Sequence, residues 1–284
     1  MSGDTAYTDL GELASRVADG DIVALPHTLS ADFSAASMVA TRALIQRGVR
    51  NLHLVGVPAL SLQADMLIGA GCVSTIQTGS ILLYEYGPAN RFVAAQKRGT
   101  LTVKDSTCPA IHAALIAGEK GLPFMPVRGL IGSDILRHRM DQDGWRVIDN
   151  PFARNDPIVL VPALRPDATL FHAPLADRCG NVWVGRRSEL ATMAHSAQKV
   201  LVTFEAIYEG DLAQSNELSP AMIPAMFITA LSHQPNGSWP LNGGIGRAED
   251  AAHMREYARL SKTDEGFAQY LGRYVTNAAA SAAA

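Results

Sequence analysis

The feature that most constrains this chain is the alternation of short apolar runs with amphipathic segments through its first half. Runs such as 21–25 and 51–57 have the length and composition of buried strands. Between them, residues 34–48 and 61–71 carry apolar side chains at helical spacing and end at glycine, a common helix stop. The pattern continues with expected strands at 72–77 and 100–105 and expected helices at 88–99 and 106–121. It predicts an α/β fold with an open, largely parallel sheet that has helices on both faces.

The second half of the chain has a different pattern. Residues 157–185 contain several short apolar runs broken by Pro and Gly, which predicts short strands. With a helix expected at 188–198 and a strand at 199–208, we expect a mixed sheet continuous with the first. Residues 219–247 are too irregular for one element but too apolar for a free linker, and packing against a partner would explain them. Residues 250–275 predict two amphipathic helices.

Domain organisation follows from the absence of breaks in this pattern. There is no internal repeat and no Ser- or Gly-rich linker, so we expect a single domain over residues 1–277. The Ala-rich residues 278–284 are expected to form a frayed tail. A chain of 284 residues that is 48% hydrophobic is long enough to bury a substantial core.

Composition and motif searches exclude several classes of function. The net charge is only −3 and Lys and Arg are dispersed, so we expect no nucleic-acid partner. No apolar run approaches the roughly 18 residues that span a bilayer, and the N-terminus lacks the features of an export signal, so a cytoplasmic location without membrane contact is expected. The three cysteines and eight histidines are not at ligand spacing, and no metal site is predicted. Motifs for dinucleotides, phosphate loops, zinc proteases and hydrolase elbows are missing.

Residues 121–134, GLPFMPVRGLIGSD, are the most distinctive segment. They resemble the A-type (alpha) half of family I CoA-transferases, above all the glutaconate CoA-transferase branch, in which an LPF-P-R-G-GSD pattern follows a long helix. Residues 163–185 resemble the family's A-x-R-P-D and AD-x-x-GN segment, and residues 199–212 its strand with a VT-x-E-x-I pattern. The resemblance covers roughly residues 10 to 277.

The resemblance implies an open α/β/α fold and an enzyme that moves CoA between an acyl-CoA and a carboxylic acid, possibly dicarboxylic. It also implies a hetero-oligomer in which A-type and B-type subunits share the active site. In the family, a glutamate nucleophile forms an acyl-glutamyl anhydride and then a glutamyl-CoA thioester. In two-subunit members that glutamate lies in a Glu-Asn-Gly context on the B-type subunit, and none of the ten glutamates here precedes Asn-Gly. We therefore expect the nucleophile on a B-type partner, coenzyme A as the only cofactor, and no metal.

The resemblance thus implies that this chain supplies the side of the shared active site that faces the nucleophile. Its candidate residues lie in loops after strands, where open α/β sheets bind ligands. The candidates for substrate or CoA binding are His27, Thr28 and Ser30 after the first strand, Gly79, Ser80 and Glu85 after the third, Asp105 and Ser106 after the fourth, and Arg128, Ser133 and Asp134 in the most distinctive segment.

Several of these candidates have two interpretations. Glu85 lies in the apolar and aromatic run ILLYEYG, where burial would favour its protonated form and suit it to acid or base chemistry; the alternative is an exposed or cap-forming loop carboxylate. Asp105 or Ser106 either caps the following helix or belongs to a helix N-terminus that faces an acyl carboxylate. Arg128 either pairs with a substrate carboxylate or forms a structural ion pair.

Three segments depart from the family pattern, at residues 25–33, 104–109 and 237–240. They leave two other functions open. Some relatives with the same two-subunit fold hydrolyse a carbon–carbon bond in a cyclic CoA thioester during steroid breakdown, with a glutamate from the A-type half, and Glu85 would suit that role. The other possibility is a CoA-binding scaffold without catalytic activity.

Overall fold

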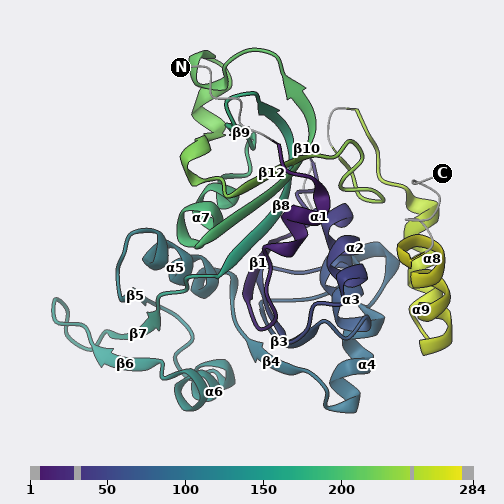
Figure 1. Cartoon of the computed structure of the whole chain (residues 1–284). Coiled ribbons are helices and arrows are strands. Elements are labelled where there is room, and N and C mark those ends of the chain that lie inside the picture. Colours follow the sequence, from purple (N-terminus) through teal and green to yellow (C-terminus); the bar gives the residue numbers. More distant parts are fainter. Residues whose placement is uncertain (1–6, 29–32, 244–245, 277–284) are drawn as a thin grey trace.

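The computed structural model describes residues 7–28, 33–243 and 246–276, and its body is a nine-stranded sheet covered by helices (Figure 1). Seven parallel strands follow one another in space: β4 (Thr102–Asp105), β3 (Val73–Thr78), β2 (Leu52–Val57), β1 (Ile22–Pro26), β8 (Ala168–Asp177), β10 (Lys199–Tyr208) and β12 (Ala230–His233). Two short strands, β9 (Val182–Trp183) and β11 (Met222–Ile223), add antiparallel pairs beside the end of β8. The predicted α/β fold with a largely parallel open sheet is confirmed.

Alternation along the strands separates two apolar layers. Leu52 and Leu54 of β2 join one buried cluster, and Val55 and Val57 join another, because side chains one residue apart point to opposite faces of a sheet. The first layer packs under α1 (Leu10–Ser15), α2 (Met38–Arg47), α3 (Leu62–Gly69) and α4 (Asn90–Arg98). The second packs under α5 (Cys108–Glu119) and α7 (Ser188–Ser196).

The first long helix begins later than the sequence pattern predicts. α2 starts at Met38 rather than at residue 34. The preceding segment bonds elsewhere: Ser34 donates its amide hydrogen to Asn242 (2.7 Å), and His172 donates to the carbonyl of Ala35 (2.7 Å). These tertiary hydrogen bonds satisfy backbone groups that a helix would otherwise use, so the segment stays extended.

The two helices expected near the C-terminus are present as α8 (Ala251–Leu260) and α9 (Asp264–Leu271), followed by a single π-helical turn, η5 (Gly272–Thr276). Asp250 and Thr263 are their N-caps, with side-chain oxygens 3.0 Å from the amides of His253 and Gly266. Tyr257, Phe267 and Tyr270 bury their rings against α2 and α3. The pair therefore forms an outer layer beside the main sheet (Figure 1).

Residues 124–162 form a lobe that projects from the body (Figure 1). It contains β5 (Phe124–Val127), α6 (Asp134–Asp143), β6 (Arg146–Asp149) and β7 (Pro157–Pro162), with the strands antiparallel in the order β5-β7-β6. Trp145, Val159 and Val161 pack against α5. The expectation that residues 157–162 join the main sheet is therefore wrong, because the buried face of β7 covers α5 while its edges pair with β5 and β6.

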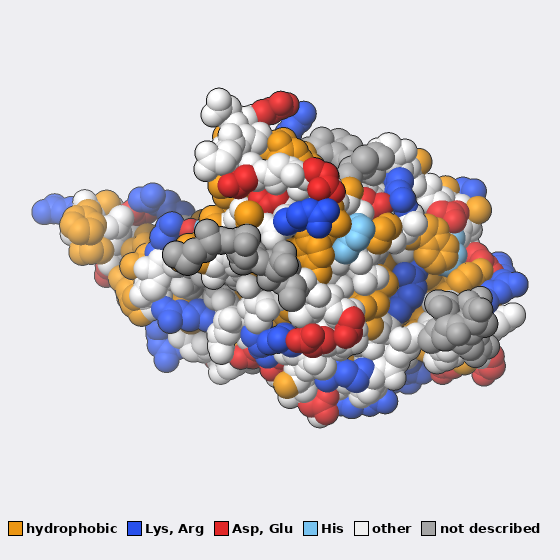
Figure 2. Space-filling model, turned by 45° about the horizontal axis from the view of Figure 1, so that its top comes forward, with side chains coloured by type: hydrophobic (Ala, Val, Ile, Leu, Met, Phe, Trp, Pro, Cys, Tyr) orange, Lys and Arg blue, Asp and Glu red, His pale blue; other side chains and the backbone are white. Residues whose placement is uncertain are grey.

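The other side of the lobe is open. Phe152 is 96% exposed, and Phe124, Ile148 and Ile131 are also exposed. Figure 2 shows hydrophobic side chains gathered over the lobe, at the left of the view. The division into one domain stays a prediction, and the expected tail at 278–284 lies outside the described residues.

The segment expected to be irregular, 219–247, is built from short pieces in its described part, 219–243 and 246–247. They are η3 (Ser219–Ala221), β11, η4 (Ala225–Phe227) and β12. Across the described ranges, no helix combines the length and apolar character needed to cross a bilayer.

Candidate functional site

The carboxyl ends of β1 to β4 meet at one edge of the sheet because these strands are parallel neighbours. His27 donates its amide hydrogen to Val57 (3.2 Å), and Ser106 donates to Thr78 (3.2 Å), so the loops that follow the strands lie side by side. This arrangement brings six predicted residues to the same edge: His27, Thr28, Gly79, Ser80, Asp105 and Ser106. Ser30 lies outside the described residues.

The turn after β3 depends on Gly79. A Cβ atom there would lie 3.3 Å from the Pro58 carbonyl oxygen and 3.6 Å from the Cys108 amide nitrogen. The Thr78 hydroxyl is 2.8 Å from the Ser80 carbonyl oxygen, which fixes the turn. The glycine thus allows the N-terminus of α5 to come close to the end of β3, and Gly79 and Ser80 remain exposed at the edge.

The N-terminus of α5 corrects one expectation. Its N-cap is Thr107, which has an extended backbone and accepts a hydrogen bond from Ala110 (3.4 Å), so neither Asp105 nor Ser106 caps the helix. Asp105 ends β4 with its side chain exposed. Ser106 is only 5% exposed, and its hydroxyl has no hydrogen-bond partner within the described structure. Such a buried, unpaired hydroxyl is uncommon and suits a polar group supplied from outside.

The loop after β1 is anchored by a residue that the sequence analysis did not single out. The buried guanidinium of Arg187 donates to the carbonyls of His27 and Phe33, both at 2.9 Å, and forms an ion pair with Glu189. Glu189 also lies 3.5 Å from His27 Nε2. Nothing in the local sequence distinguishes Arg187 from its neighbour Arg186, so only the fold identifies this role.

Glu85 lies in a single 3₁₀ turn, η1 (Tyr84–Tyr86), beyond the end of β3. Its side chain is exposed, so of the two interpretations of Glu85 the structure favours the exposed loop carboxylate over the buried one. The turn directs Leu83 into the core and leaves the carboxylate of Glu85 on the outside. An acid or base role for Glu85 therefore cannot rest on burial and stays a proposal.

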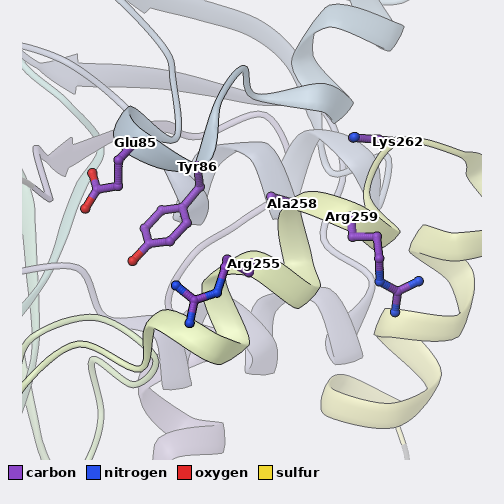
Figure 3. A pocket seen from close by; sticks show the side chains of 6 residues that line it. All are labelled: Glu85, Tyr86, Arg255, Ala258, Arg259 and Lys262. Atoms are coloured by element: carbon purple, nitrogen blue, oxygen red, sulfur yellow. The ribbon is translucent and has the colours of Figure 1, made fainter.

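Two hollows share Glu85 and Tyr86 as lining residues. One, of about 340 Å³, extends from Thr28 and Ser61 to Leu241 and the start of α8. The other, of about 550 Å³, lies between η1 and α8 and is lined by Arg255, Arg259 and Lys262 (Figure 3). The Tyr86 hydroxyl donates to Glu249, and burial together with this bond raises the pKa of Tyr86 to about 12. A hollowed surface thus leads from the loop after β1 to α8.

The other three predicted residues lie in the lobe and have structural partners there. Arg128 forms a two-pronged ion pair with Asp156, at 3.1 and 2.6 Å. Ser133 caps α6 by accepting from Leu136 (3.2 Å), and Asp134 pairs with Arg137 (2.6 Å) on the surface. None of the three lines either hollow beside Glu85. For Arg128 the observed contact is the structural ion pair that the sequence analysis gave as an alternative.

Thr203 and Glu205 of the VT-x-E-x-I segment, on β10, belong to a buried polar cluster. His172 of β8 lies 2.9 Å from the Thr203 hydroxyl through Nδ1 and 3.3 Å from Glu205 through Nε2. Burial lowers the pKa of His172, which favours the neutral ring. Burial alone would raise the pKa of Glu205, but hydrogen bonds from His172 and Asn236 and the charge of Arg247 outweigh it and lower the pKa. The cluster therefore ties Asn236 and Arg247 to the sheet, and between them in sequence Leu241 and Asn242 line the smaller hollow.

The sheet edge and the two hollows present polar groups along a connected surface. Among the described residues there is no group of three or more His, Cys, Asp or Glu side chains that could hold a metal ion. The exposed backbone at Gly79 and the hydroxyl of Ser106 lie at the sheet edge, and a basic helix lies at the far end of the hollows.

Comparison with known proteins gives sequence relatives but no match to a family model. The A-type half of the 3-oxoadipate CoA-transferase of Pseudomonas knackmussii is 29% identical over 91% of this chain and 89% of its own length. The IpdA component of a cholesterol ring-cleaving hydrolase from Rhodococcus jostii is 28% identical over 84% of this chain and 82% of the relative. An uncharacterised protein of Archaeoglobus fulgidus is also 28% identical over 82% of this chain, and the chain spans about half the length of that relative (51%).

The fold has solved counterparts. The crystal structure of glutaconate CoA-transferase from Acidaminococcus fermentans superposes with a TM-score of 0.84, at 24% identity over 96% of this chain and 89% of that chain. In sequence, the A-type half of the enzyme from the same organism is 28% identical over 82% of this chain and 76% of the relative. The chain is thus similar in sequence to A-type subunits of CoA-transferases, and it shares the fold of glutaconate CoA-transferase.

Proposed function

We propose that this chain is the A-type half of an enzyme that moves CoA from an acyl-CoA to a carboxylic acid, and that a B-type partner carries the nucleophilic glutamate. The observation that supports this most is the likeness to the A-type half of a CoA-transferase over 91% of this chain and 89% of that relative. Coenzyme A, as acyl-CoA, is the only cofactor that the reaction needs. The cytoplasmic location expected from the sequence remains part of the proposal.

On this proposal the chain positions the acyl group and does not attack it. None of its ten glutamates has the Glu-Asn-Gly context of the family nucleophile. Splitting the transfer into an anhydride step and a thioester step requires that nucleophile to meet the acyl carbon, so the partner must approach the sheet edge. The hydroxyl of Ser106 and the exposed turn at Gly79 and Ser80 are the groups of this chain that we propose to face the acyl end.

The test uses the chain copurified with its B-type partner. The complex is treated with an acyl-CoA, reduced with borohydride to trap any glutamyl thioester, digested, and mapped by mass spectrometry. A reduced glutamate on the partner, dependent on acyl-CoA, is the expected result. Acyl-CoA consumption without a modified glutamate on either chain would contradict the transferase mechanism.

A second candidate is the hydrolytic cleavage of a carbon–carbon bond in a cyclic CoA thioester, with a carboxylate of this chain as the catalytic group. It is favoured by the Rhodococcus jostii relative, which is about as similar as the 3-oxoadipate transferase, and by the exposed position of Glu85 beside both hollows. In that case Glu85→Gln would abolish acyl-CoA consumption, and no adduct would form on the partner. If the chain is a scaffold, Glu85→Ala, Asp105→Ala and Arg128→Ala would all leave turnover unchanged with the complex intact.

A further inference from the structure

The larger hollow beside η1 is lined by an excess of positive charge. Among its described lining residues, Arg255, Arg259 and Lys262 contribute three cations and Glu85 the only carboxylate. Arg255 and Arg259 are four residues apart on α8, which places both on one face of the helix about 6 Å apart along its axis. Lys262 follows in the turn before α9. Figure 3 shows the side chain of Arg255 pointing toward Tyr86, with Arg259 and Lys262 farther from Tyr86, toward the right of the view.

These three cations differ from other basic residues nearby in their ion pairing. Within residues 7–28, 33–243 and 246–276, none of the three forms an ion pair with a carboxylate. Other arginines of the same region do: Arg91 and Arg98 pair with Asp264, and Arg273 pairs with Glu256 at 2.8 Å. Within the described part of the chain these other arginines thus have carboxylate partners, whereas the cations that line the hollow have none. Clefts lined by one sign of charge concentrate ligands of the opposite sign.

The position of the hollow indicates which anion it takes. It shares Glu85 and Tyr86 with the smaller hollow, which reaches Thr28 at the sheet edge. A ligand lying along both would have its reactive end at the carboxyl edge and its anionic end on α8. An acyl-CoA fits this arrangement, because its reactive thioester and its anionic phosphates lie at opposite ends of the molecule. Arginine is well suited to the phosphate end because its planar guanidinium donates two parallel hydrogen bonds.

We infer that Arg255, Arg259 and Lys262 form a binding site for the phosphate groups of the CoA nucleotide. The inference rests on the proposed function for the identity of the ligand. It assigns to this chain the recognition of the nucleotide part of CoA, in addition to the contacts with the acyl group at the sheet edge. Glu85 then lies between the two ends of the ligand, and the tyrosine hydroxyl held by Glu249 lines the passage.

Three variants test the site. Arg255→Gln combined with Arg259→Gln removes two positive charges, and Arg255→Lys combined with Arg259→Lys keeps them. A matched control, Lys97→Gln combined with Arg154→Gln, removes the same charge from exposed positions on α4 and in the lobe. All six substitutions are at exposed side chains, so circular dichroism and the melting temperature are expected to match wild type.

The measurement is the dissociation constant of CoA by isothermal titration calorimetry, with the chain in complex with its B-type partner. The glutamine variant should bind CoA at least about tenfold more weakly, the lysine variant should fall between it and wild type because it keeps the charge but loses the paired hydrogen bonds, and the control should stay within about threefold of wild type. Inorganic phosphate is titrated in parallel and should bind wild type far more weakly than CoA. Unchanged CoA affinity in the glutamine variant, or phosphate binding as tight as that of CoA, would overturn the assignment.

Acyl-CoA turnover by the same preparations separates this inference from the proposed function. If wild type transfers CoA and the glutamine variant keeps its CoA affinity, the phosphate site is wrong and the function stands. If the glutamine variant loses CoA affinity while wild type transfers nothing, the site stands and the function is wrong.

Discussion

Asp65 provides a pH-dependent test of how the helical layers are held together. Its side chain is fully buried on α3, where Oδ1 accepts from the Phe92 amide at 2.8 Å and Oδ2 accepts from the Tyr257 hydroxyl at 2.7 Å. The carboxyl thus connects α3 to α4 and α8. Burial raises its pKa from 3.8 to about 6, against the opposing effect of these two hydrogen bonds and the charge of Arg91.

The sign of the effect on stability follows from proton linkage. Asp65 holds its proton more tightly in the folded chain than in the unfolded one, so the folded state binds more protons between pH 3.8 and about 6. The stability that the raised pKa of Asp65 adds to the folded state is fully present below pH 3.8 and is lost as the pH rises to about 6. At about 1.4 kcal/mol per pH unit, the loss amounts to about 3 kcal/mol.

Asp65→Asn mimics the protonated acid, because its oxygen can face the Phe92 amide while its amide group donates to Tyr257. It should not show this loss. The free energy of unfolding of Asp65→Asn minus that of wild type should therefore rise by about 3 kcal/mol between about pH 4 and pH 7. Urea titrations followed by circular dichroism across that range measure it.

Tyr257→Phe and Asp264→Asn serve as sign controls. Tyr257→Phe removes a donor that favours the ionised carboxylate, so it should make the loss of stability larger and extend it to higher pH. The hydrogen bond from Arg91 lowers the pKa of Asp264, so Asp264→Asn should lose stability relative to wild type as the pH rises. A stability difference between Asp65→Asn and wild type that does not change with pH would refute the reasoning.

Three further predictions concern packing and capping. Trp145→Ala should destabilise the lobe by about 3–5 kcal/mol, because a fully buried ring is lost, and hydrogen exchange should speed up in β5 to β7 before the main sheet. Gly118→Ala should lower the melting temperature, since its Cβ would lie 2.2 Å from the Leu164 carbonyl oxygen; Gly272→Ala, with no atom within 4 Å, is the matched control, and equal melting temperatures would count against this packing. Thr107→Ala should cost about 1 kcal/mol through loss of the α5 cap, and Thr107→Ser should retain most of it; equal denaturation midpoints for all three chains would contradict the cap assignment.

The candidate site shows where sequence reasoning was sufficient. The positions after β1, β3 and β4 could be placed together because parallel strands direct their carboxyl ends to one edge. Local patterns could not tell which neighbouring residue would cap α5, because Asp105, Ser106 and Thr107 are all good caps and only the backbone angles of Thr107 decide. The roles of all these residues in binding stay predictions.

Other parts of the site had no local signal. Arg187 holds the loop after β1 from about 160 residues away in sequence, and the ion-pair partner that distinguishes Arg98 from Arg255 comes from α9. The spacing of Arg255 and Arg259 is visible in the sequence, but it is equally typical of any solvated helix face. Whether such cations face a hollow or open solvent depends on the elements packed beside them.

The sequence by itself determined the alternation of strands and helices, hence the parallel sheet, its two apolar layers and the resemblance to A-type CoA-transferase subunits, because these follow from periodicity and motifs within short segments. Tertiary structure alone decided that residues 124–162 leave the main sheet, that Glu85 is exposed and that α2 starts four residues late. Each of these outcomes depends on a partner distant in sequence: α5 for the lobe, the core around Leu83 for the turn at Glu85, and Asn242 for the extended segment before α2. Distant partners compete with local preference for the same backbone groups and apolar surface, and at these positions they prevail.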